Sequence, residues 1–353
     1  MKHRTRGSIL IVVVGMLGLL ILLTVSVGRR ANQELGLIKY SLQKVQARYL
    51  AWGGFYYALN AMREDALDEV SSRFDNSYTC GFKLAEDSLP ESLFKEIKVG
   101  NGWFNVTTGD PVRYGMGDED GKLNLNALTL QNDRIFAELL MIAGVQQEQA
   151  ERMAADTVDW MDENTQSAQA SMAQQPQQQQ AEGPFGYDKK QFSAKNRPFD
   201  QVYELMFIDG MTPAIYEKIK PLVTVFPRRS DSVKINLATA PLNVLLALAK
   251  YSSGPLTNTS RDDADSLISK LMAFRIGEDR IIGTADDQTL EESKMPLTMS
   301  EQVIFRAMSL MEAKISRFLA FRVSGFEGNN RRQSTIDAVI DRETLTVVSW
   351  RNN

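Results

Sequence analysis

Acidic side chains are the groups in this sequence of 353 residues that could bind a metal or do chemistry. The segment GEDRIIGTADD places Glu278, Asp279, Asp286 and Asp287 around a turn that contains glycine. If the loop folds back on itself, several carboxylate and carbonyl oxygens can meet at a hard cation, which prefers such ligands. A solvated acidic loop has the same spacing. The residues therefore leave a cation site and a solvated loop both open.

A second acidic group, Asp118, Glu119 and Asp120, directly precedes Gly121. An EF-hand calcium loop needs glycine at its sixth position and glutamate at its twelfth. In this loop the twelfth position is Thr129. The segment is therefore not an EF-hand.

Three aspartates, Asp156, Asp159 and Asp162, recur at every third position of a predicted helix, which places them on one face. A row of this kind is usually solvated or paired with basic side chains. Paired carboxylates can also hydrolyse a glycosidic bond, so a membrane-tethered hydrolase is one functional hypothesis, which ranks below the two given later. Trp160 beside them is predicted to be a packing residue.

The rarest residues exclude several kinds of catalysis. His3 is the only histidine and Cys80 the only cysteine, so the chain cannot form an intramolecular disulfide. If the segment that holds His3 is removed, no histidine is left for general base catalysis, a serine-histidine pair or the common zinc sites. The 40 basic and 44 acidic residues, a formal net charge of −4, provide no basic footprint for nucleic acid. We expect no enzyme activity, no organic cofactor and no bound nucleic acid.

An uncharged apolar run over residues 8–27 is long enough to cross a membrane once. A helix of about twenty residues spans about 30 Å, the thickness of the hydrocarbon core. Lys2, Arg4 and Arg6 precede the run and favour a cytoplasmic N-terminus. The run is too long for the apolar part of an ordinary signal peptide. Gly7 is then either the last residue of a specialised leader or simply a residue before an anchor.

The apolar run continues without proline into an amphipathic segment over residues 29–63. Its apolar residues return at intervals of three, four and seven, which is helical spacing: Leu35, Leu42, Val45, Tyr49, Tyr56 and Leu59. We expect one helix over residues 8–62, half in the membrane and half packed on a soluble domain. The stripe is expected to form domain core on one face and to contact helices of neighbouring subunits on another. Gly53 and Gly54 predict a weak point or a close-packing point.

Strands are predicted on both sides of a helical middle section. The N-terminal candidates are residues 78–85, a hairpin over residues 96–107 with its turn at residues 100–102, and residues 111–116. The C-terminal candidates are residues 318–326, 334–341 and 345–350, joined by short polar turns. Since the candidates lie on both sides of the middle section, we expect one sheet that needs both ends of the chain.

The middle section, residues 127–311, is predicted to be helical and to contain a repeat. AELLMIAGVQQEQAERM from Ala137 aligns with YELMFIDGMTPAIYEKI from Tyr203, so that each copy reads helix, glycine turn, helix around Gly144 or Gly210. Hairpins of this kind also bind DNA phosphates, which makes a membrane-anchored DNA receptor of the competence type the second functional hypothesis. Because neither turn contains a basic residue, we favour a packing role for both glycines. The Gln-rich residues 164–183 are predicted to be a mobile loop.

The leader and the first helix resemble those of type IV prepilin-like proteins, in which a peptidase cleaves after the glycine and methylates the new amine. Here the resemblance implies cleavage between Gly7 and Ser8. These proteins usually carry glutamate at the fifth mature position, where this chain has Val12. In the family that glutamate is thought to pair with the N-terminal amine of the preceding subunit. Its absence suits a subunit at the end of a fibre.

The chain as a whole resembles the general secretion pathway protein K family, the K-type minor pseudopilins of type II secretion. The segments that carry the resemblance are, in order, YGMGDEDGKLNLNA, VDWMDEN, FDQVYELMFIDGMTP, KINLATAP and GEDRIIGTADD. The resemblance implies a position at the pseudopilus tip, and I-type and J-type minor pseudopilins, the major pseudopilin and a prepilin peptidase as partners. It also implies calcium in the helical domain, which favours calcium at Glu278, Asp279, Asp286 and Asp287 over a solvated loop.

We therefore predict an α+β fold with a long N-terminal transmembrane helix and a pilin-like antiparallel sheet. The predicted parts are a leader (1–7), the membrane half of the helix (8–27), a pilin-like core (28–126 and 312–353) and an inserted all-α domain with helix-glycine-helix repeats (127–311). The predicted function is that of a non-enzymatic minor pseudopilin that initiates or caps the periplasmic pseudopilus of a type II secretion system. We expect a single-pass protein of the bacterial inner membrane, with its N-terminus cytoplasmic and most of the chain periplasmic.

Overall fold

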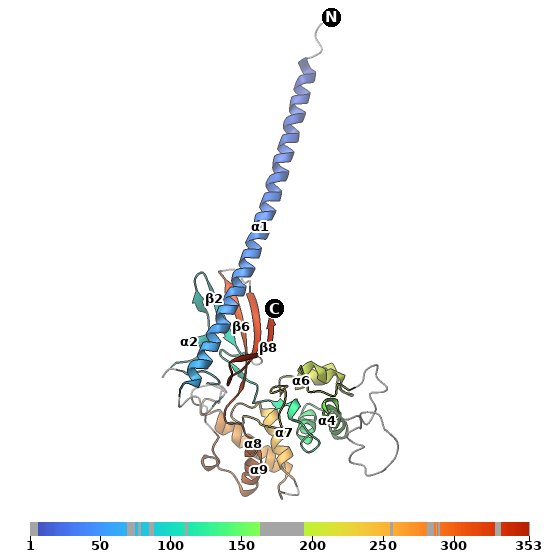
Figure 1. Cartoon of the computed structure of the whole chain (residues 1–353), viewed down its shortest axis with the longest axis vertical. Coiled ribbons are helices and arrows are strands. Elements are labelled where there is room, and N and C mark those ends of the chain that lie inside the picture. Colours follow the sequence, from blue (N-terminus) through green and yellow to red (C-terminus); the bar gives the residue numbers. More distant parts are fainter. Residues whose placement is uncertain are drawn as a thin grey trace.

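A single long helix stands out from the rest of the molecule (Figure 1). The computed structural model describes residues 6–68, 75–76, 79–84, 88–109, 112–162, 194–254, 257–280, 286, 288, 290–328 and 333–352. The helix α1 (Arg6–Ala66) has 61 residues and no proline. At 1.5 Å per residue it is about 90 Å long. The prediction of one helix over residues 8–62 is confirmed.

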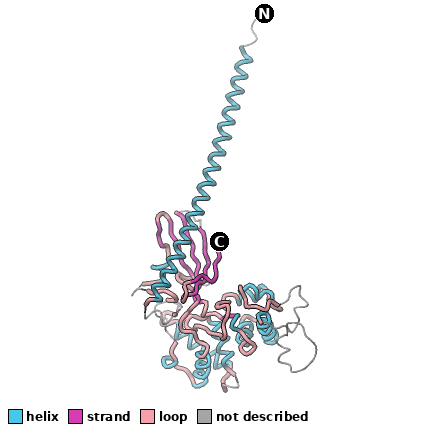
Figure 2. The backbone as a smooth tube through the Cα atoms, in the orientation of Figure 1, coloured by secondary structure: helices cyan, strands magenta, loops and turns pink. Residues whose placement is uncertain are grey.

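An antiparallel sheet packs against the C-terminal half of α1 (Figure 2). Its strands lie in the order β1 (Ile97–Val99), β2 (Gly102–Thr107), β6 (Phe318–Glu327), β7 (Gln333–Asp341) and β8 (Thr346–Asn352), and β3 (Gly117–Asp118) also pairs with β6. The short helix α2 (Pro90–Phe94) precedes β1. The predicted hairpin over residues 96–107 and the three C-terminal strands are confirmed. The sheet therefore takes its strands from both sides of the helical section.

Two glycines allow α1 to lie directly on the sheet. At Gly325 of β6, an added Cβ would lie 2.4 Å from the carbonyl oxygen of Ala47 and from the amide nitrogen of Ala51, both in α1. At Gly54 of α1, an added Cβ would lie 2.5 Å from a methyl group of Val323 in β6. Any side chain at these positions would push the two layers apart. Gly54 is therefore the close-packing point, whereas a Cβ added at Gly53 would meet nothing within 4 Å.

The prediction of a strand over residues 78–85 is wrong for the part that is described, residues 79–84, which form turns and irregular backbone. Side chains upstream take the backbone donors that a strand would need: Asn76 Oδ1 accepts from the Thr79 amide at 2.8 Å, and Asp75 Oδ1 accepts from the Gly81 amide at 3.0 Å. Gly81 also has φ = +74°, which breaks an extended run. In the segment 111–116, the described residues make only a single bridge, between Tyr114 and Thr107.

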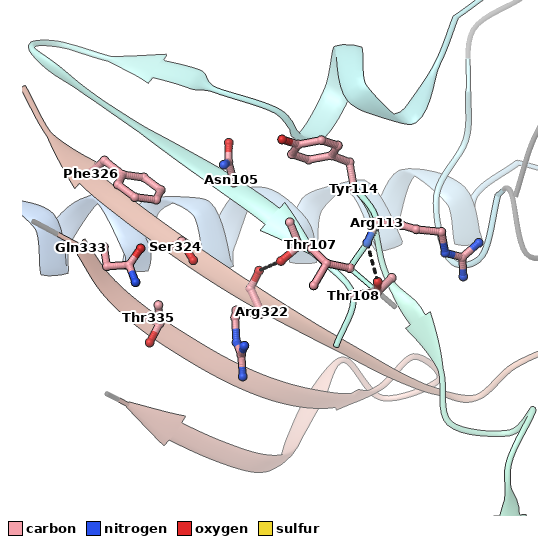
Figure 3. A pocket seen from close by; sticks show the side chains of 11 residues that line it. Asn105, Thr107, Thr108, Arg113, Tyr114, Arg322, Ser324, Phe326, Gln333 and Thr335 are labelled. Carbon is pink, nitrogen blue, oxygen red and sulfur yellow. Dashed lines mark hydrogen bonds between the residues drawn. The ribbon is translucent and has the colours of Figure 1, made fainter. Parts of the chain in front are cut away.

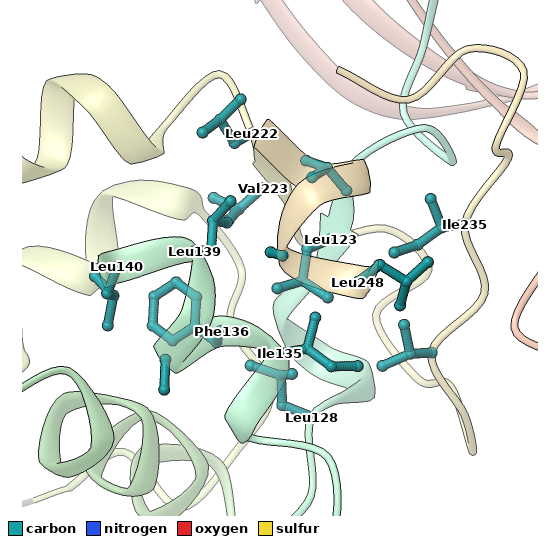
Figure 4. Close-up of a cluster of buried hydrophobic side chains, with 14 of the residues drawn as sticks. Leu123, Leu128, Ile135, Phe136, Leu139, Leu140, Leu222, Val223, Ile235 and Leu248 are labelled. Carbon is teal, nitrogen blue, oxygen red and sulfur yellow. The ribbon is translucent and has the colours of Figure 1, made fainter. Parts of the chain in front are cut away.

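Helices form a second layer around their own hydrophobic cluster, between Leu123 and Met308 in the sequence (Figure 4). Phe136, Leu139 and Leu248 are fully buried at its centre. A smaller cluster lies between α1 and the sheet, with Phe55, Phe104 and Phe321 among its members. The described helices of the larger cluster are η2 (Leu125–Ala127), α3 (Arg134–Ile142), α4 (Gln147–Met161), η4 (Val202–Phe207), α6 (Pro213–Ile219), α7 (Leu242–Ser252), α8 (Arg261–Arg275), η5 (Glu292–Lys294) and α9 (Met299–Ser309).

The helical layer is not purely α-helical. Strands β4 (Leu123–Asn124) and β5 (Val223–Thr224) form a short parallel pair, because both segments are buried and must pair their backbone groups. The first of these strands also lies before the expected boundary at residue 127. The predicted Gln-rich loop, residues 164–183, lies outside the described residues.

Candidate functional site

The face of α1 opposite the sheet exposes large apolar side chains beyond the membrane-length run. The face toward the sheet is lined by small or well-packed buried residues: Ala47, Ala51, Phe55, Ala58 and Met62. The opposite face, which we name the outer ridge, consists of Leu35, Ile38, Leu42, Val45, Tyr49, Trp52 and Tyr56. At about 100° per residue the two faces lie about 145° apart around the helix. The sheet therefore covers one face and leaves the other exposed.

The outer ridge holds five of the six stripe residues that the sequence singles out. Tyr49 is 74% exposed and Val45 48% exposed. Leu59, the sixth, is partly buried against the smaller cluster. The part of the prediction that made this stripe domain core is therefore wrong for the ridge residues, because the alanine-rich face allows the closer approach to the sheet.

Aromatic rings connect the C-terminal end of the outer ridge to the last strand. The rings of Trp52 and Trp350 of β8 lie 5.4 Å apart between centroids, and Phe55 meets Trp350 edge-on at 4.8 Å. Trp52 and Trp350 each remain 37% exposed. Tryptophan and tyrosine are enriched among the residues that dominate binding energy in protein interfaces. The ridge thus ends in a surface whose chemistry suits a protein partner.

The N-terminal end of α1 carries the residues of the predicted processing site. Gly7 and Ser8 lie in the first turn of α1, and cleavage between them stays a prediction. Val12 is 55% exposed in the apolar part of the helix. The first acidic residue of α1 is Glu34, beyond the membrane-length run. Among the described residues, α1 is the one helix that is long and apolar enough to cross a membrane.

A buried ion cluster closes the C-terminal end of α1. Arg342, which follows β7, donates from Nη1 to Asp75 Oδ2 at 2.7 Å and from Nη2 to Asp65 Oδ2. Both carboxylates are buried, and the Arg342 side chain is 6% exposed. Burial raises the pKa of Asp75, against the lowering effect of Arg342. One guanidinium therefore holds the end of α1, the segment after it and the β7–β8 turn together.

Asp118 of β3 extends this cluster toward the helical layer. Its Oδ2 accepts from the hydroxyl groups of Thr239 and Ser316, each at 2.5 Å. Ser316 Oγ in turn accepts from the side-chain Nδ2 group of Asn236 at 2.9 Å. Burial raises the pKa of Asp118 to about 7, with a further contribution from Asp120. Asp118 thus connects β3 of the sheet to Asn236 and Thr239, which precede α7.

Asp120 anchors the start of β6 from the same loop. Its Oδ2 accepts from the backbone amides of Arg317 at 2.5 Å and Phe318 at 3.0 Å. The backbone carbonyl oxygen of Asp120 accepts from the backbone amide of Asn236 at 2.8 Å. Burial raises the pKa of Asp120 to about 6. Asp65, Asp75, Asp118, Asp120, Asn236, Thr239, Ser316 and Arg342 form what we name the junction network.

Sequence reasoning missed the junction network. The segment of Asp118 and Asp120 is visible as an acidic cluster, but the sequence only excludes an EF-hand there. Asp75 and Arg342 are 267 residues apart, and Asp118 and Ser316 are 198 apart, so no local pattern joins them.

The predicted calcium residues are only partly described. Asp286 Oδ2 accepts from the backbone amides of Glu278 at 2.7 Å and Asp279 at 3.0 Å, so this carboxylate closes its own turn. Asp287 lies outside the described residues. In the described ranges, no three acidic, cysteine or histidine side chains gather in an arrangement that could hold a metal. The described residues alone do not build a calcium site, and calcium there stays a prediction.

The sequence left the aspartate row of α4 either solvated or paired with basic side chains, and a solvated row is wrong for Asp156 and Asp159. Asp156 and Asp159 are buried and Asp162 is half-buried, because this face of α4 turns toward the interior. Trp160 is buried and stacks on Phe207 at 5.7 Å between ring centroids. Its predicted packing role is confirmed.

The two hairpin glycines lie in turns that each contact a helix of the other copy. Gly144 and Gly210 both have positive φ, +100° and +82°. An added Cβ at Gly210 would lie 3.3 Å from the Met153 sulfur in α4, and Lys218 Nζ of α6 donates to the carbonyl oxygen of Ala143 at 2.8 Å. The first half of the second copy is the 3₁₀ helix η4 in place of an α-helix. Both turns therefore contact the other copy.

Comparisons with known proteins agree on one family. Residues 121–228 match the family model "Type II secretion system (T2SS), protein K". The chain is 23% identical over 257 residues to the type II secretion system protein K of Klebsiella pneumoniae, covering 70% of this chain and 71% of the relative. It is 24% identical over 303 residues to the protein of the same name from Dickeya chrysanthemi, covering 71% of this chain and 75% of the relative.

A solved structure shares the fold. It is a chain in the crystal structure of the GspK-GspI-GspJ complex from the type 2 secretion system of enterotoxigenic Escherichia coli. The TM-score is 0.58 at 16% sequence identity, and the match covers 90% of this chain and 99% of that one. The segment matched by the family model lies almost entirely in the helical layer, and the solved structure shares the fold over most of the chain. In sequence and in fold, the chain is similar to the type II secretion system protein K family.

Proposed function

We propose that the chain is a non-enzymatic minor pseudopilin that initiates or caps the periplasmic pseudopilus of a type II secretion system. Its expected partners are I-type and J-type minor pseudopilins and, below them, the major pseudopilin. The structural relative was crystallised in a complex with GspI and GspJ, which supports the first two partners. The expected location is the inner membrane, with the N-terminus cytoplasmic as Lys2, Arg4 and Arg6 favour.

The observation that carries this proposal is the outer ridge. An apolar face that continues for several turns beyond the membrane-length run is costly to leave in water. Fully burying one Leu, Ile or Val side chain of the ridge contributes about 1.5–3 kcal/mol. Long helices with such faces pack side by side, so assembly needs no catalytic group. The ridge therefore fits the helices of neighbouring pseudopilins.

The position of the helical layer supports a place at the tip. The layer lies at the end of the molecule opposite the N-terminus and is broader than α1 (Figure 1). A second subunit stacked above it would meet this layer in place of a free helix. Val12 leaves the subunit without the family's glutamate for a preceding subunit's amine. Growth is then possible only from the membrane side, after a prepilin peptidase has cleaved between Gly7 and Ser8 and methylated the new amine.

A pair of neighbouring substitutions tests the proposal. Val45→Arg places a charge on the outer ridge, whereas Gln46→Arg places the same charge about 100° around the helix. Both residues are exposed, so neither substitution should change the folding of the chain. Each variant is expressed with the I-type and J-type partners in cells whose own copy is deleted. Copurification of the partners and secretion into the medium are measured.

Val45→Arg is expected to reduce copurification at least about tenfold, since a buried charge opposes helix packing, and to reduce secretion with it. Gln46→Arg is expected to behave like the unmodified chain. Equal behaviour of the two variants would contradict a role for the ridge.

A further inference from the structure

The face of the sheet turned away from α1 contains a hollow of about 560 Å³ (Figure 3). Strands β2, β6 and β7 form its floor, and residues 108 and 112–114 form one wall. The strand residues that face α1, such as Val106, Val323 and Ile336, are buried. Their neighbours alternate to the other side, so Asn105, Ser324 and other polar residues line the hollow.

The floor consists of polar side chains that lie opposite one another on three adjacent strands. Asn105 is opposite Ser324, and Ser324 is opposite Thr335, so one row crosses the sheet with a spacing of about 4.8 Å. Gln333 lies one row further, opposite Phe326. Hydroxyl and carboxamide groups both donate and accept hydrogen bonds. Asn105 Oδ1 already accepts from the backbone amide of Glu96 at 2.6 Å, so its Nδ2 group is the part that a ligand can use. In the part of the chain that the structure describes, the side chains of Ser324, Thr335 and Gln333 make no hydrogen bond.

Aromatic rings stand on either side of Asn105 (Figure 3). Phe326 is stacked on Trp103 at 3.8 Å between centroids, with an interplanar angle of 16°, so one of its faces is already supported. Tyr114 lies under the ammonium group of Lys95, which is 5.5 Å from the ring centroid. Both rings line the hollow. Supported rings of this kind present a flat apolar platform beside the polar floor.

The hollow does not suit several common ligands. Arg322 is held by Asp337, with Nε–Oδ1 at 2.5 Å and Nη2–Oδ2 at 3.1 Å, so it is not a free anion receptor. Arg113, the other arginine of the lining, is also already engaged in an interaction within the chain. Strands β6 and β7 are paired on both sides. Strand β2 pairs with β1 only over Gly102–Phe104, and beyond that its backbone bonds the segment 113–115, so the floor offers no free strand edge to an extended peptide. An amphipathic helix needs an apolar groove, whereas this floor is polar.

We propose that this hollow binds a neutral saccharide. The ring faces of a sugar can pack against Phe326 and Tyr114, while its hydroxyl groups, which also donate and accept, pair with Asn105, Ser324 and Thr335. The row on three strands is wide enough for a short oligosaccharide. This site is separate from the outer ridge, because α1 lies on the opposite face of the sheet (Figure 3).

The experiment titrates the full-length chain, in a detergent without a sugar headgroup, with chitotetraose and with cellotetraose. Binding is followed by saturation-transfer difference NMR and isothermal titration calorimetry. We expect a dissociation constant of about 1 mM or lower for at least one probe. The double variant Ser324→Ala/Thr335→Val removes two hydroxyl groups from the floor. We expect it to bind at least about tenfold more weakly.

Two controls keep the result interpretable. Ser349→Ala removes an exposed hydroxyl group from β8, outside the hollow, and is expected to leave binding unchanged. Phe326→Leu keeps an apolar side chain but removes the ring, and is expected to weaken binding. Circular dichroism confirms that each variant is folded. The proposal is overturned if the unmodified chain shows no binding of either probe at a probe concentration of about 10 mM, ten times the expected dissociation constant. It is also overturned if the folded double variant binds as tightly as the Ser349→Ala control.

Discussion

Arg342 shows at the scale of one residue how this fold depends on distant charges. It lies between Asp65 and Asp75, and all three side chains are buried. Replacing it by methionine would leave two carboxylates buried close together without a counter-charge. We expect Arg342→Met to lower the free energy of unfolding by about 3–5 kcal/mol, measured by denaturant titration in micelles.

The matched control is Arg306→Met, in which the arginine side chain is 67% exposed and bonded to Glu292. An exposed pair contributes at most about 1 kcal/mol. A loss of similar size in both variants would show that Arg342 is not a structural centre.

The raised pKa of Asp118 predicts an unusual dependence of stability on pH. Its pKa in the folded chain is raised to about 7, so the folded state binds its proton more tightly than the unfolded state. This contribution is fully present at low pH and is lost as the pH rises through 7. The pKa of the neighbouring Asp120 is raised to about 6, so its contribution to stability changes with pH in the same direction. We expect the free energy of unfolding to be about 1–2 kcal/mol lower at pH 8 than at pH 6.

Histidine is the side chain whose unperturbed pKa lies in this range, and the chain contains a single one, His3. Asp118→Asn should remove most of the difference between pH 6 and pH 8. An unchanged difference in this variant would assign the pH dependence to another group.

At this scale the sequence locates charged residues but not their partners. The Asp118 segment is recognisable as an acidic cluster, yet its hydroxyl partners Thr239 and Ser316 come from segments 121 and 198 residues away. Asp286 is a member of the predicted calcium set, but its carboxylate accepts from the amides of its own turn.

At the scale of elements, α1 and its neighbouring glycines allow a sharp comparison. Gly53→Ala adds a methyl group in open space within a helix and should stabilise the chain by about 1 kcal/mol. Gly54→Ala places the same group 2.5 Å from Val323 and 2.6 Å from the ring of Phe104. Overpacking of this kind costs about 1–3 kcal/mol. Thermal unfolding of the two variants should therefore shift in opposite directions, and shifts of the same sign would contradict the close approach of α1 to the sheet.

Periodicity and turn chemistry predicted the regular elements well. An uninterrupted apolar pattern without proline predicted α1, and alternation between short polar turns predicted β6, β7 and β8. The strand over residues 78–85 was predicted wrongly, because the side chains of Asp75 and Asn76 bind the backbone amides locally. The stripe from Leu35 to Tyr56 was correct as a pattern but not as core. Spacing alone does not show which face of a helix a sheet will cover.

At the scale of the whole molecule, two hydrophobic clusters are joined by the junction network. The sequence predicted a helical middle section, but the way in which it contacts the sheet depends on pairs such as Asp120 with Phe318. Such contacts bring together segments without local sequence signals. The arrangement of the two layers could therefore not be predicted from the sequence.

The processing prediction also belongs to the whole molecule. The intact mass of the chain, extracted from membranes of cells that contain a prepilin peptidase, should correspond to a polypeptide that begins at Ser8 and carries one methyl group. The same extraction from cells without the peptidase is the control. A mass that still includes Met1 to Gly7 would make Gly7 a residue before an ordinary anchor and would remove the basis for fibre assembly.

The central claim is that the outer ridge of α1 packs against partner pseudopilin helices, and crosslinking in intact membranes tests it most directly. The natural Cys80 is buried, and burial raises the pKa of its thiol well above the usual range, so it should stay unreactive. Val45→Cys and Gln46→Cys are each expressed with single-cysteine I-type and J-type partners and treated with a short bismaleimide. We predict a crosslinked pair for Val45→Cys and little or none for Gln46→Cys. Crosslinking that is absent at both positions, or equal at both, would contradict the claim.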